Sequence, residues 1–323
     1  MKCLLFGARG QVGWELQRSL APLGDLITLE RASSDYCGDL TDLAGIASAV
    51  RAIKPDVVVN AAAYTAVNQA ESDAGTAHTV NALAPGVLAE SARAIGALLV
   101  HYSTDYVFNG SGSQPWQESD ATGPLNVYGH TKLEGEQRVA AANARHLIFR
   151  SSWVYSARGS NFIKTILQKA TGRNGRQSVQ HDCWQDQQQD TLAVVNDQFG
   201  APTSAQLLAD VTAYAIRQVL QQPSDAGLYH VAAGGETTWF DYANHAMDRL
   251  KRAQPAIKII VKNIQPIASA EPATFAALPS VPPAAQRPKN SRLSTAKLQQ
   301  TFGLHLPHWQ VGVNRLLADI HLD

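Results

Sequence analysis

The sequence predicts an α/β fold in which a doubly wound parallel sheet is joined to a smaller second part. Two observations carry this prediction. Short apolar runs alternate with longer amphipathic stretches through the first half of the chain, and a glycine-rich loop joins the first run to the first amphipathic stretch. Short apolar runs are typical of strands buried on both faces, and a repeated strand–helix–strand order builds a parallel sheet with right-handed crossovers.

The predicted elements of the first half follow one another in strict alternation. The apolar runs, interpreted as strands, are residues 2–6, 26–29, 57–60, 98–103 and 146–150. The amphipathic stretches, interpreted as helices, are residues 13–23, 43–53, 77–95 and 126–142. The alternation predicts that residues 1–150 form one domain centred on a sheet.

The pattern loosens after residue 150. Further elements are predicted as helices at residues 161–171, 205–221 and 239–251 and as a strand at residues 228–231. Because residues 205–221 have the character of a sheet-covering helix, we expect a segment around residues 192–222 to complete the first domain. The remainder, residues 151–191 and 223–323, is expected to form a substrate-binding part interleaved with that domain.

Two stretches of the second half have an unusual composition. Residues 182–190 (D-C-W-Q-D-Q-Q-Q-D) are polar and glutamine-rich, which predicts an exposed loop or a mobile excursion. Residues 267–288 contain five prolines, which exclude a continuous helix or a central strand there.

Composition limits the classes of function. The 323 residues are 45% hydrophobic and 17% charged with a formal net charge of zero, so no general attraction to nucleic acid or an anionic membrane is expected. The three cysteines, Cys3, Cys37 and Cys183, fit no metal-ligand spacing and no disulfide framework, which favours a reducing compartment. The run at residues 2–6 is too short for a signal peptide, and no apolar run reaches the ~18 residues of a membrane span. We therefore expect a cytoplasmic protein without nucleic-acid or membrane partners.

The loop G-A-R-G-Q-V-G carries Gly7, Gly10 and Gly13, follows the first predicted strand and opens the first helix. Glycines permit a tight turn and a close backbone approach to a pyrophosphate, and the helix N-terminus supplies unpaired N–H groups. The alternative is a glycine-rich turn without a ligand, but the flanking strand and helix favour a dinucleotide. The fold is therefore predicted to be Rossmann-like, with NADH or NADPH as the cofactor.

The end of the second predicted strand bears on the choice of cofactor. Glu30 lies where a carboxylate accepts hydrogen bonds from an adenosine ribose and disfavours a 2′-phosphate. Arg31 follows at once and could instead pair with that phosphate. NADH and NADPH therefore both stay open, with a preference for NADH. Asp39 and Leu40 could contact the edge of the adenine or belong to the N-cap region of the next helix, and the sequence supports these two interpretations equally.

The third predicted strand ends in the segment N-A-A-A-Y-T, residues 60–65. Ligands of open parallel sheets bind beyond the carboxyl ends of the strands, so small alanines there would let a cofactor lie against the backbone. The same alanines could serve close helix packing, and only their position favours the ligand.

A candidate catalytic group comes from the fourth strand and the next helix. Thr104 and Asp105 end the strand, and Tyr128 and Lys132 lie four positions apart on one face of the helix. A lysine ammonium beside a tyrosine stabilises the phenolate and lowers a pKa that is ordinarily about 10. Thr104 could then hold a substrate carbonyl while Tyr128 protonates the developing alkoxide. Asp105 could bind substrate hydroxyls or cap local backbone, with a slight preference for the first.

These motifs resemble those of the extended short-chain dehydrogenase/reductase superfamily and, more closely, its dTDP-4-dehydrorhamnose reductase family. The resemblance covers nearly the whole chain. The segments that carry it are residues 7–16 (G-A-R-G-Q-V-G-W-E-L), 101–108 (H-Y-S-T-D-Y-V-F), 124–132 (P-L-N-V-Y-G-H-T-K), 150–155 (R-S-S-W-V-Y), 196–203 (N-D-Q-F-G-A-P-T) and 287–293 (R-P-K-N-S-R-L). It implies reduction of the C4 ketone of a nucleotide sugar, dTDP-4-dehydro-L-rhamnose, by NADH or NADPH.

The resemblance also implies what individual residues do. Tyr128 would donate the proton. Lys132 would lower the pKa of Tyr128 and bind the nicotinamide ribose, and Thr104 would adjust the hydrogen bond to the substrate. The implied cofactor contacts are Gln11 and Val12 with Gly7, Gly10 and Gly13 of the same loop, then Glu30, Asp39 and Leu40, and finally Ala63, Tyr64, Thr65 and Tyr102. The implied substrate contacts are Thr104, Asp105 and Trp153. Without the resemblance, Trp153 would be interpreted as a core residue.

Members of this family can bind magnesium through carboxylates at a dimer contact, so the resemblance implies that a homodimer can form. Glu15 and Asp319 correspond to two of the metal ligands, whereas the third position holds Gln206. A neutral amide is a weak ligand for a hard cation, so we expect no tight magnesium binding. The glutamine-rich residues 182–190 look like an insertion relative to the family, and their composition does not decide whether they cover the substrate cleft or an interface.

Two other functions stay open. A nucleotide-sugar epimerase or dehydratase shares the glycine loop and the Tyr-x-x-x-Lys pair but recycles a tightly held cofactor. A non-catalytic regulatory subunit on the same scaffold would bind a dinucleotide without turnover. The intact set of Thr104, Tyr128 and Lys132 argues against the second.

Overall fold

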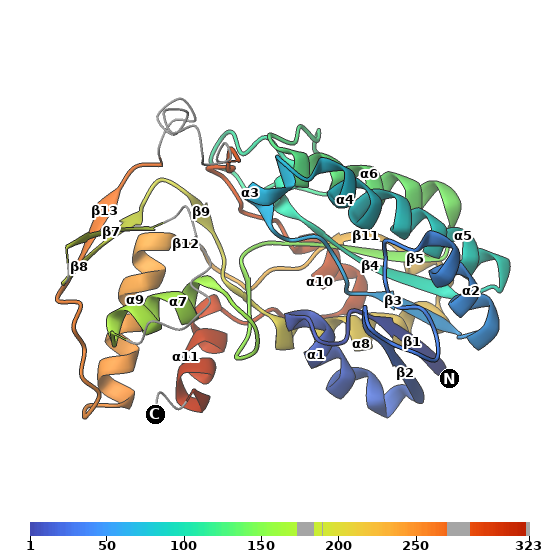
Figure 1. Ribbon diagram of the computed structural model, residues 1–323, viewed down its shortest axis with the longest axis horizontal. Helices are drawn as coiled ribbons and strands as arrows, with labels where there is room; N and C mark the ends of the chain where they lie inside the picture. Colours follow the sequence, from blue (N-terminus) through green and yellow to red (C-terminus); the bar gives the residue numbers. More distant parts are fainter. Residues whose placement is uncertain (173–183, 189, 270–284, 321–323) are drawn as a thin grey trace.

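The computed structural model describes residues 1–172, 184–188, 190–269 and 285–320. These residues form a larger part around a six-stranded sheet and a smaller part around a three-stranded sheet, which lie side by side (Figure 1). Within the described ranges, no helix combines the length and the apolar character needed to cross a bilayer.

The six-stranded sheet is entirely parallel, with the strand order β11-β5-β4-β3-β1-β2. The chain runs from β1 outward to β2 and then crosses to β3 on the other side, so the sheet is doubly wound and the connections diverge between β1 and β3. The strands are β1 (Lys2–Phe6), β2 (Asp25–Leu29), β3 (Val57–Asn60), β4 (Leu98–Thr104), β5 (His146–Ser151) and β11 (Gly227–His230). The predicted α/β class and the five predicted strands of the first half are confirmed.

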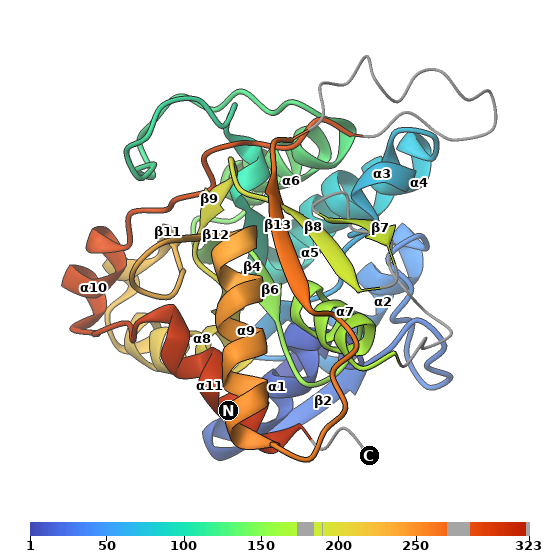
Figure 2. The same cartoon turned by 90° about the vertical axis from the view of Figure 1, so that its left-hand side faces the viewer.

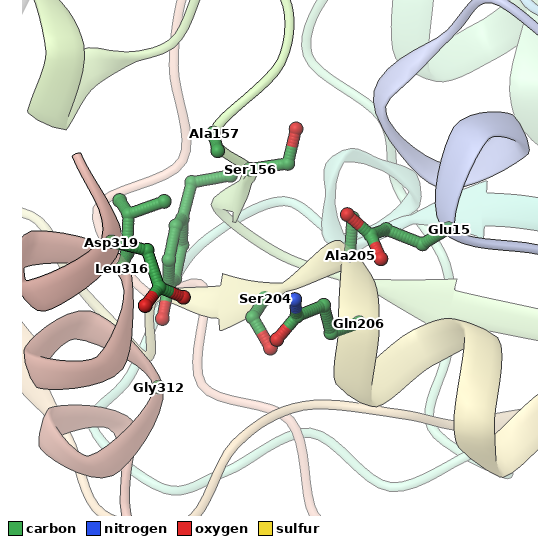
Figure 3. Close-up of a pocket in the computed structure, with 10 residues that line it drawn as sticks. Glu15, Ser156, Ala157, Ser204, Ala205, Gln206, Gly312, Leu316 and Asp319 are labelled. Atoms are coloured by element: carbon green, nitrogen blue, oxygen red, sulfur yellow. The ribbon is translucent and has the colours of Figure 1, made fainter. Parts of the chain in front are cut away.

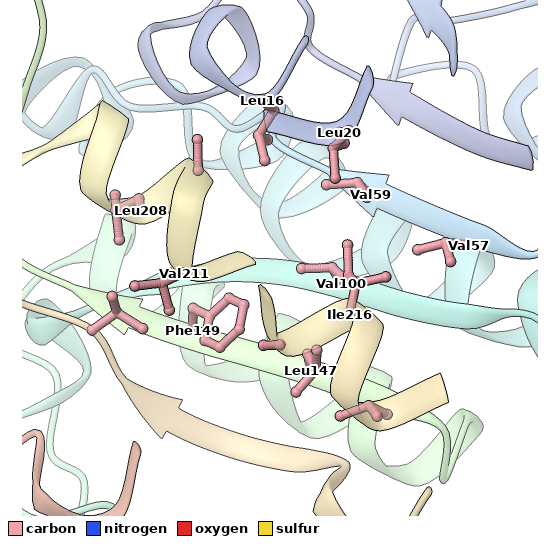
Figure 4. Close-up of a cluster of buried hydrophobic side chains, with 14 of the residues drawn as sticks. Leu16, Leu20, Val57, Val59, Val100, Leu147, Phe149, Leu208, Val211 and Ile216 are labelled. Carbon is pink, nitrogen blue, oxygen red and sulfur yellow. The ribbon is translucent and has the colours of Figure 1, made fainter. Parts of the chain in front are cut away.

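Helices cover both faces of this sheet. Successive strand residues point to opposite faces, so Val59 and Val100 pack against α1 and α8 (Figure 4), while Val58 and Leu99 pack toward α2, α5 and α6. A further helix, α10, packs beside α8 near β11. The bounds are α1 (Gln11–Leu20), α2 (Leu43–Ile53), α5 (Ala84–Ala94), α6 (Val127–Ala142), α8 (Ala205–Gln221) and α10 (Ala296–Phe302).

The helix predicted at residues 77–95 is divided into three segments. Helix α4 is followed without a break by a π-helical turn, η2, and then by α5, whose first turn contains Pro85. A π-helical turn widens the helix by one residue and is frequent at functional sites. The short helices of the larger part are η1 (Ala21–Leu23), α3 (Val67–Ala70), α4 (Ala74–His78), η2 (Thr79–Leu83), η3 (Asp105–Val107) and η4 (Pro223–Asp225).

In the smaller part, α9 packs against a sheet of order β13-β8-β7, and α7 and α11 pack against α9. Figure 2 looks onto this part, with α9 and β13 facing the viewer. Its core includes the aromatic side chains of Phe162, Tyr242 and Trp309. The elements are β7 (Trp184–Gln188), β8 (Thr191–Val195), β13 (Asn263–Ile267), α7 (Phe162–Ala170), α9 (Trp239–Ala253) and α11 (Trp309–Asp319), with the short pairs β6 (Val154–Tyr155) and β10 (Thr203–Ser204), and β9 (Phe199–Gly200) and β12 (Thr237–Thr238).

The prediction of a loop at residues 182–190 is wrong for residues 184–188. They form β7, which pairs antiparallel with β8. The composition argument failed because strand formation depends strongly on context, and here the segment has β8 as a pairing partner. Residues 182, 183 and 189 lie outside the described ranges, as do residues 270–284 of the proline-rich stretch. Pro266 lies in β13, an edge strand, where a missing N–H group is tolerated.

The structure differs from the predicted division of the chain at two points. Strand β11 belongs to the stretch assigned to the substrate-binding part, yet it forms the sixth strand of the large sheet beside β5. Strand β8 belongs to the segment assigned to the first domain, yet it is the central strand of the small sheet. Helix α8 packs on the large sheet as predicted. The two parts are therefore interleaved more finely than the sequence pattern indicated.

Candidate active site

The carboxyl ends of β1, β3 and β4 lie at one edge of the large sheet, because neighbouring parallel strands point the same way. Three sequence-predicted groups follow these ends directly: the glycine loop, the alanine segment at residues 61–63, and the Ser-Thr-Asp strand end. The fold therefore brings together residues that are separated by about a hundred positions in the sequence.

The glycine loop forms a backbone cradle at the start of α1. Gly7 has a φ of +81°, and a Cβ atom on it would lie 2.6 Å from the backbone nitrogen of Ala62. A Cβ atom on Gly13 would overlap the carbonyl oxygen of Gly7. Gly10 caps α1 without a side-chain hydrogen bond, so the first N–H groups of the helix are available to an anion. The observed cradle fits the pyrophosphate of a dinucleotide.

The adenosine end of the predicted cofactor site carries two ion pairs. Arg9 Nε lies 2.6 Å from Glu30 Oε2, and Arg31 Nε lies 3.1 Å from Asp39 Oδ2. Each acidic residue that could bind a ribose is thus paired with an arginine that could bind a 2′-phosphate. The side chain of Leu40 is buried beneath them in the core. This balance of charge favours neither NADH nor NADPH.

The segment after β3 is held by an asparagine that the sequence analysis missed. The backbone N–H of Tyr64 donates to Asn81 Oδ1 at 2.9 Å, and Asn81 Nδ2 donates to the Tyr64 carbonyl at 3.0 Å and to Thr131 Oγ1 at 3.2 Å. Asn81 is fully buried in the π-helical turn η2. Asparagine is unfavourable in the interior of a helix, so the position of Asn81 inside the predicted helix was the one signal in the sequence that it has a special function. It fixes Ala63, Tyr64 and Thr65 against α6.

Thr104, Asp105 and Tyr128 come together where β4 ends and α6 begins. Thr104 Oγ1 accepts a hydrogen bond from the Tyr106 N–H at 3.2 Å and donates to Asp105 Oδ1 at 3.1 Å. Asn126 caps α6, since its Oδ1 accepts from the N–H of residue 129 at 2.8 Å, and this places Tyr128 in the first turn. The ring of Tyr128 meets the ring of Tyr106 edge-on, with centroids 5.5 Å apart.

The electrostatics of Tyr128 differ from the expectation. Burial raises the pKa of Tyr128, the negative charge of Asp105 raises it further, and a hydrogen-bonding contact with Thr104 acts in the opposite direction. The prediction that Lys132 lowers this pKa is wrong for this arrangement. The physical reason is that Lys132 Nζ is directed at β4, where it donates to the Tyr102 carbonyl at 2.5 Å and lies 3.4 Å from His101 Nε2.

Two further buried groups of the site have displaced pKa values. Burial lowers the pKa of Lys132 to about 8, against the opposing charge of Glu136. Burial raises the pKa of Asp105 to about 6, against the opposing effects of neighbouring hydroxyls and of Arg287. Arg287, another residue whose position the sequence did not predict, donates from Nη1 to the Tyr106 hydroxyl at 2.8 Å. Displaced pKa values of several groups in one place are typical of functional sites.

Trp153 lies just beyond β5 with a positive φ of 50°, an uncommon backbone conformation for a large side chain. Its ring stacks on Trp239 of α9 with centroids 3.7 Å apart, and it packs closely against the backbone of Gly200. Trp153 is only half-buried, so it is not an ordinary core residue. The side chain of Tyr102, another predicted contact, is directed toward α8, where its hydroxyl bonds Thr212 Oγ1 at 2.6 Å.

The residues predicted as metal ligands line one pocket between the two parts. Glu15 of α1, Gln206 of α8 and Asp319 of α11 all extend toward it (Figure 3). In the part of the chain that the structure describes, no three His, Cys, Asp or Glu side chains are arranged to hold a metal ion. Two carboxylates and one neutral amide do not fit a hard cation that is bound tightly by oxygen anions. We assign no chemical step to a metal here.

Comparison with known proteins gives a consistent result. The family model described as the RmlD substrate binding domain matches residues 1–322. The dTDP-4-dehydrorhamnose reductase of Escherichia coli K12 is 50% identical over 320 residues, which cover 99% of this chain and 98% of that protein. The enzyme of that name from Burkholderia thailandensis is 41% identical over 324 residues, with 99% of each chain covered.

Solved structures agree with the sequence comparison. The dTDP-4-dehydrorhamnose reductase from Clostridium acetobutylicum has a TM-score of 0.80 at 33% identity, and the alignment covers 98% of both chains. The enzyme of that name from Bacillus anthracis, solved in complex with NADP, has a TM-score of 0.81 at 29% identity over 99% of both chains.

Proposed function

The chain belongs to the RmlD substrate-binding-domain family and is an NAD(P)H-dependent oxidoreductase, and from this premise we propose that it reduces the C4 ketone of dTDP-4-dehydro-L-rhamnose, with Tyr128 as the proton donor. One observation supports the proposal most: Thr104 at the end of β4 meets Tyr128 in the first turn of α6, at the same edge of the sheet as the glycine loop. A ketone held there would have a proton donor on one side and a dinucleotide site on the other.

The dinucleotide would be held by the loop of Gly7, Gly10 and Gly13 and by the N-terminus of α1. When bound, it supplies a hydride for the carbonyl carbon. The neighbouring residues Gln11 and Val12 would line the pyrophosphate. Gln11 is held in place by Asn161, whose Nδ2 donates to Gln11 Oε1 at 2.9 Å, so the smaller part contacts the cofactor loop directly.

Tyr128 is suited to giving a proton rather than taking one. Burial and the charge of Asp105 raise its pKa, so the phenol keeps its proton at neutral pH. The oxygen of a ketone that is being reduced becomes a strong base, which can take that proton at the end of a short hydrogen bond. Thr104 keeps a hydroxyl beside Tyr128 and would orient the same oxygen.

Asp105 and Trp153 would bind the sugar nucleotide. Asp105 is 2% exposed and has a hydroxyl donor from Thr104, and a buried carboxylate of this kind accepts hydrogen bonds from sugar hydroxyls. Trp153, just beyond β5 of the larger part, stacks on Trp239 of α9 in the smaller part and offers a flat apolar surface. Substrate would therefore bridge the larger and the smaller part.

Oxidation of NADH and NADPH, followed at the absorbance of the reduced nicotinamide with dTDP-4-dehydro-L-rhamnose as substrate, tests the proposal. We expect stoichiometric consumption of one or both dinucleotides. An epimerase or dehydratase would turn substrate over with no net consumption, and a regulatory subunit would bind the dinucleotide without turnover. Either outcome would exclude the proposed reduction.

A homodimer and a cytoplasmic location are also part of the proposal. The large apolar side chains of Trp14 on α1 and Val311 on α11 are 45% and 58% exposed, and both helices border the pocket of Figure 3. An exposed apolar patch is typical of a surface that binds another protein, and we propose that Trp14 and Val311 contribute to such a surface. Light scattering across a concentration series tests whether two copies associate there.

A further inference from the structure

A histidine that has no function in the mechanism above lies against the amine of Lys132. His101 is 1% exposed in the middle of β4, and its Nε2 lies 3.4 Å from Lys132 Nζ. Burial and the neighbouring Lys132 hold the pKa of His101 well below its usual range, so the imidazole is neutral at working pH. A neutral imidazole carries one proton, and the nitrogen that carries it decides how the ring meets the lysine.

The orientation of the ring is determined by Asn60. Asn60 and His101 are register partners on the adjacent strands β3 and β4. Asn60 Oδ1 accepts the backbone N–H of Ala62 at 3.2 Å, and Asn60 Nδ2 lies 3.2 Å from His101 Nδ1. A backbone N–H can only donate, so the oxygen of Asn60 must face Ala62 and its NH₂ group must face the ring.

The tautomer of His101 follows from these contacts. Nδ1 faces an NH₂ donor and must therefore accept, which leaves the single proton of the neutral ring on Nε2. The Nε2–H group points at Lys132 Nζ. An ammonium at that position would bring two donors together, whereas an uncharged amine would offer its lone pair.

The titratable and charged groups near Lys132 come from three elements. Glu136 lies one turn further along α6 and its charge favours the ammonium. Arg150 of β5 neutralises Glu136 in a buried ion pair of 2.6 Å. Among the described residues, His101 of β4 is the one side chain within hydrogen-bonding distance of the amine, while the Tyr102 carbonyl accepts from it. The equilibrium between the ammonium and the uncharged amine of Lys132 therefore depends on which nitrogen of the His101 imidazole carries the proton.

We propose that Asn60 and His101 are positioning residues for Lys132: Asn60 directs the Nε2–H group of His101 at the lysine nitrogen, and this contact favours the uncharged amine over the ammonium. The proposal rests on the proposed function, since Lys132 is expected to bind the nicotinamide ribose of the dinucleotide. Its consequence is that the charge of Lys132 changes near the working pH, because burial and the contact with His101 act in the same direction on the amine.

The tautomer can be observed directly in the unmodified protein. Long-range ¹H–¹⁵N correlation spectra distinguish a protonated Nδ1 from a protonated Nε2, and the His101→Phe variant identifies the signals of the ring. We expect a neutral Nε2–H tautomer at neutral pH. A ring protonated at Nδ1, or a doubly protonated ring, would overturn the proposal. This measurement does not depend on turnover, so it stays informative if the proposed reduction fails.

The effect on Lys132 is tested by reversing the tautomer. In Asn60→Asp, one carboxylate oxygen still accepts from the N–H of Ala62, and the other accepts from a protonated Nδ1 of His101. Nε2 of His101 is then unprotonated and can accept a hydrogen bond from the ammonium of Lys132. The ammonium of Lys132 should then keep its proton to higher pH. We expect the alkaline limb of kcat/KM, taken to report the loss of this proton, to move up by about one pH unit, in the range that a new favourable charge contact produces. An unchanged alkaline limb would contradict the proposal.

The added negative charge could act through space without the imidazole, and the double variant Asn60→Asp/His101→Phe separates these causes. If the ring transmits the effect, the upward movement disappears when the ring is replaced. If the movement persists in the double variant, the charge acts alone and the proposal is wrong. Should the Asn60→Asp protein fail to fold, the tautomer spectrum decides the question.

Discussion

At the scale of single residues, the proposed reduction requires the hydroxyl of Tyr128 as its proton donor, and this proposal can be tested by substitution. We expect Tyr128→Phe to lower kcat by about 10²–10⁴-fold, the range that one positioned proton donor contributes. Dinucleotide affinity should stay nearly unchanged, because the glycine loop is intact. Steady-state kinetics and fluorescence titration with NADPH measure the two quantities.

Tyr242→Phe provides the matched control for Tyr128. Tyr242 is a buried tyrosine of the smaller part, and its hydroxyl is among the buried polar atoms without a hydrogen-bond partner. Removal of this hydroxyl should leave kcat within about twofold, since no polar contact is lost. Equal losses in the two variants would show that Tyr128 acts through packing rather than proton transfer.

The buried carboxyl of Asp105 makes stability depend on pH. Its pKa in the folded protein is about 6, raised from 3.8, so the folded state binds a proton there more tightly than the unfolded chain does. The stability that this proton binding contributes is present in acid and is lost as the pH rises through about 6. Asp105→Asn removes the buried charge and should stabilise the protein at pH 7 by about 1–3 kcal/mol. Urea unfolding at several pH values should show this advantage growing from about pH 4 to pH 7. An advantage that is constant with pH would mean that the carboxyl is not the cause.

At the scale of elements, the turn from β1 into α1 tolerates only glycine at its closest contact. A Cβ atom on Gly13 would overlap the carbonyl oxygen of Gly7, which cannot move without displacing the cradle. Gly13→Ala should therefore cost about 1–3 kcal/mol of stability and weaken dinucleotide binding. Thermal unfolding with and without NADPH measures both effects.

Gly75→Ala is the control for that substitution. Gly75 lies in α4, and a Cβ atom there would meet nothing within 4 Å. Alanine is the better helix former by about 0.5–1 kcal/mol, so this variant should be as stable as the wild type or more stable. A loss of stability at Gly75 similar to that at Gly13 would refute the steric explanation.

At the scale of the whole molecule, the pocket in Figure 3 collects residues from α1, α8 and α11. Because Gln206 stands where a third carboxylate would be needed, we expect neither added magnesium nor chelation of magnesium to move the unfolding temperature. Gln206→Glu restores a third carboxylate and should give a magnesium-dependent stabilisation of about 1–3 kcal/mol at millimolar concentrations. A fall in the unfolding temperature of the wild type on chelation would contradict this expectation.

The elements of the larger part could be predicted from sequence because their signals are local. A buried parallel strand such as β3 is a run of apolar residues, and a helix start such as that of α6 is marked by its cap, Asn126. The spacing of Tyr128 and Lys132 follows from the helix period alone. Strand β7 could not be predicted in this way, because its pairing with β8 is not signalled by the composition of residues 184–188.

The sequence by itself determined the individual strands and helices of the larger part, the glycine turn and the order of Thr104, Tyr128 and Lys132, because each of these depends on neighbours within a few residues. Only the tertiary structure decided that β11 is the sixth strand, that Trp153 stacks on Trp239, and that Lys132 is directed at β4. The physical reason is that these contacts join segments far apart in the chain, where burial and hydrogen-bond direction act only after the chain has folded.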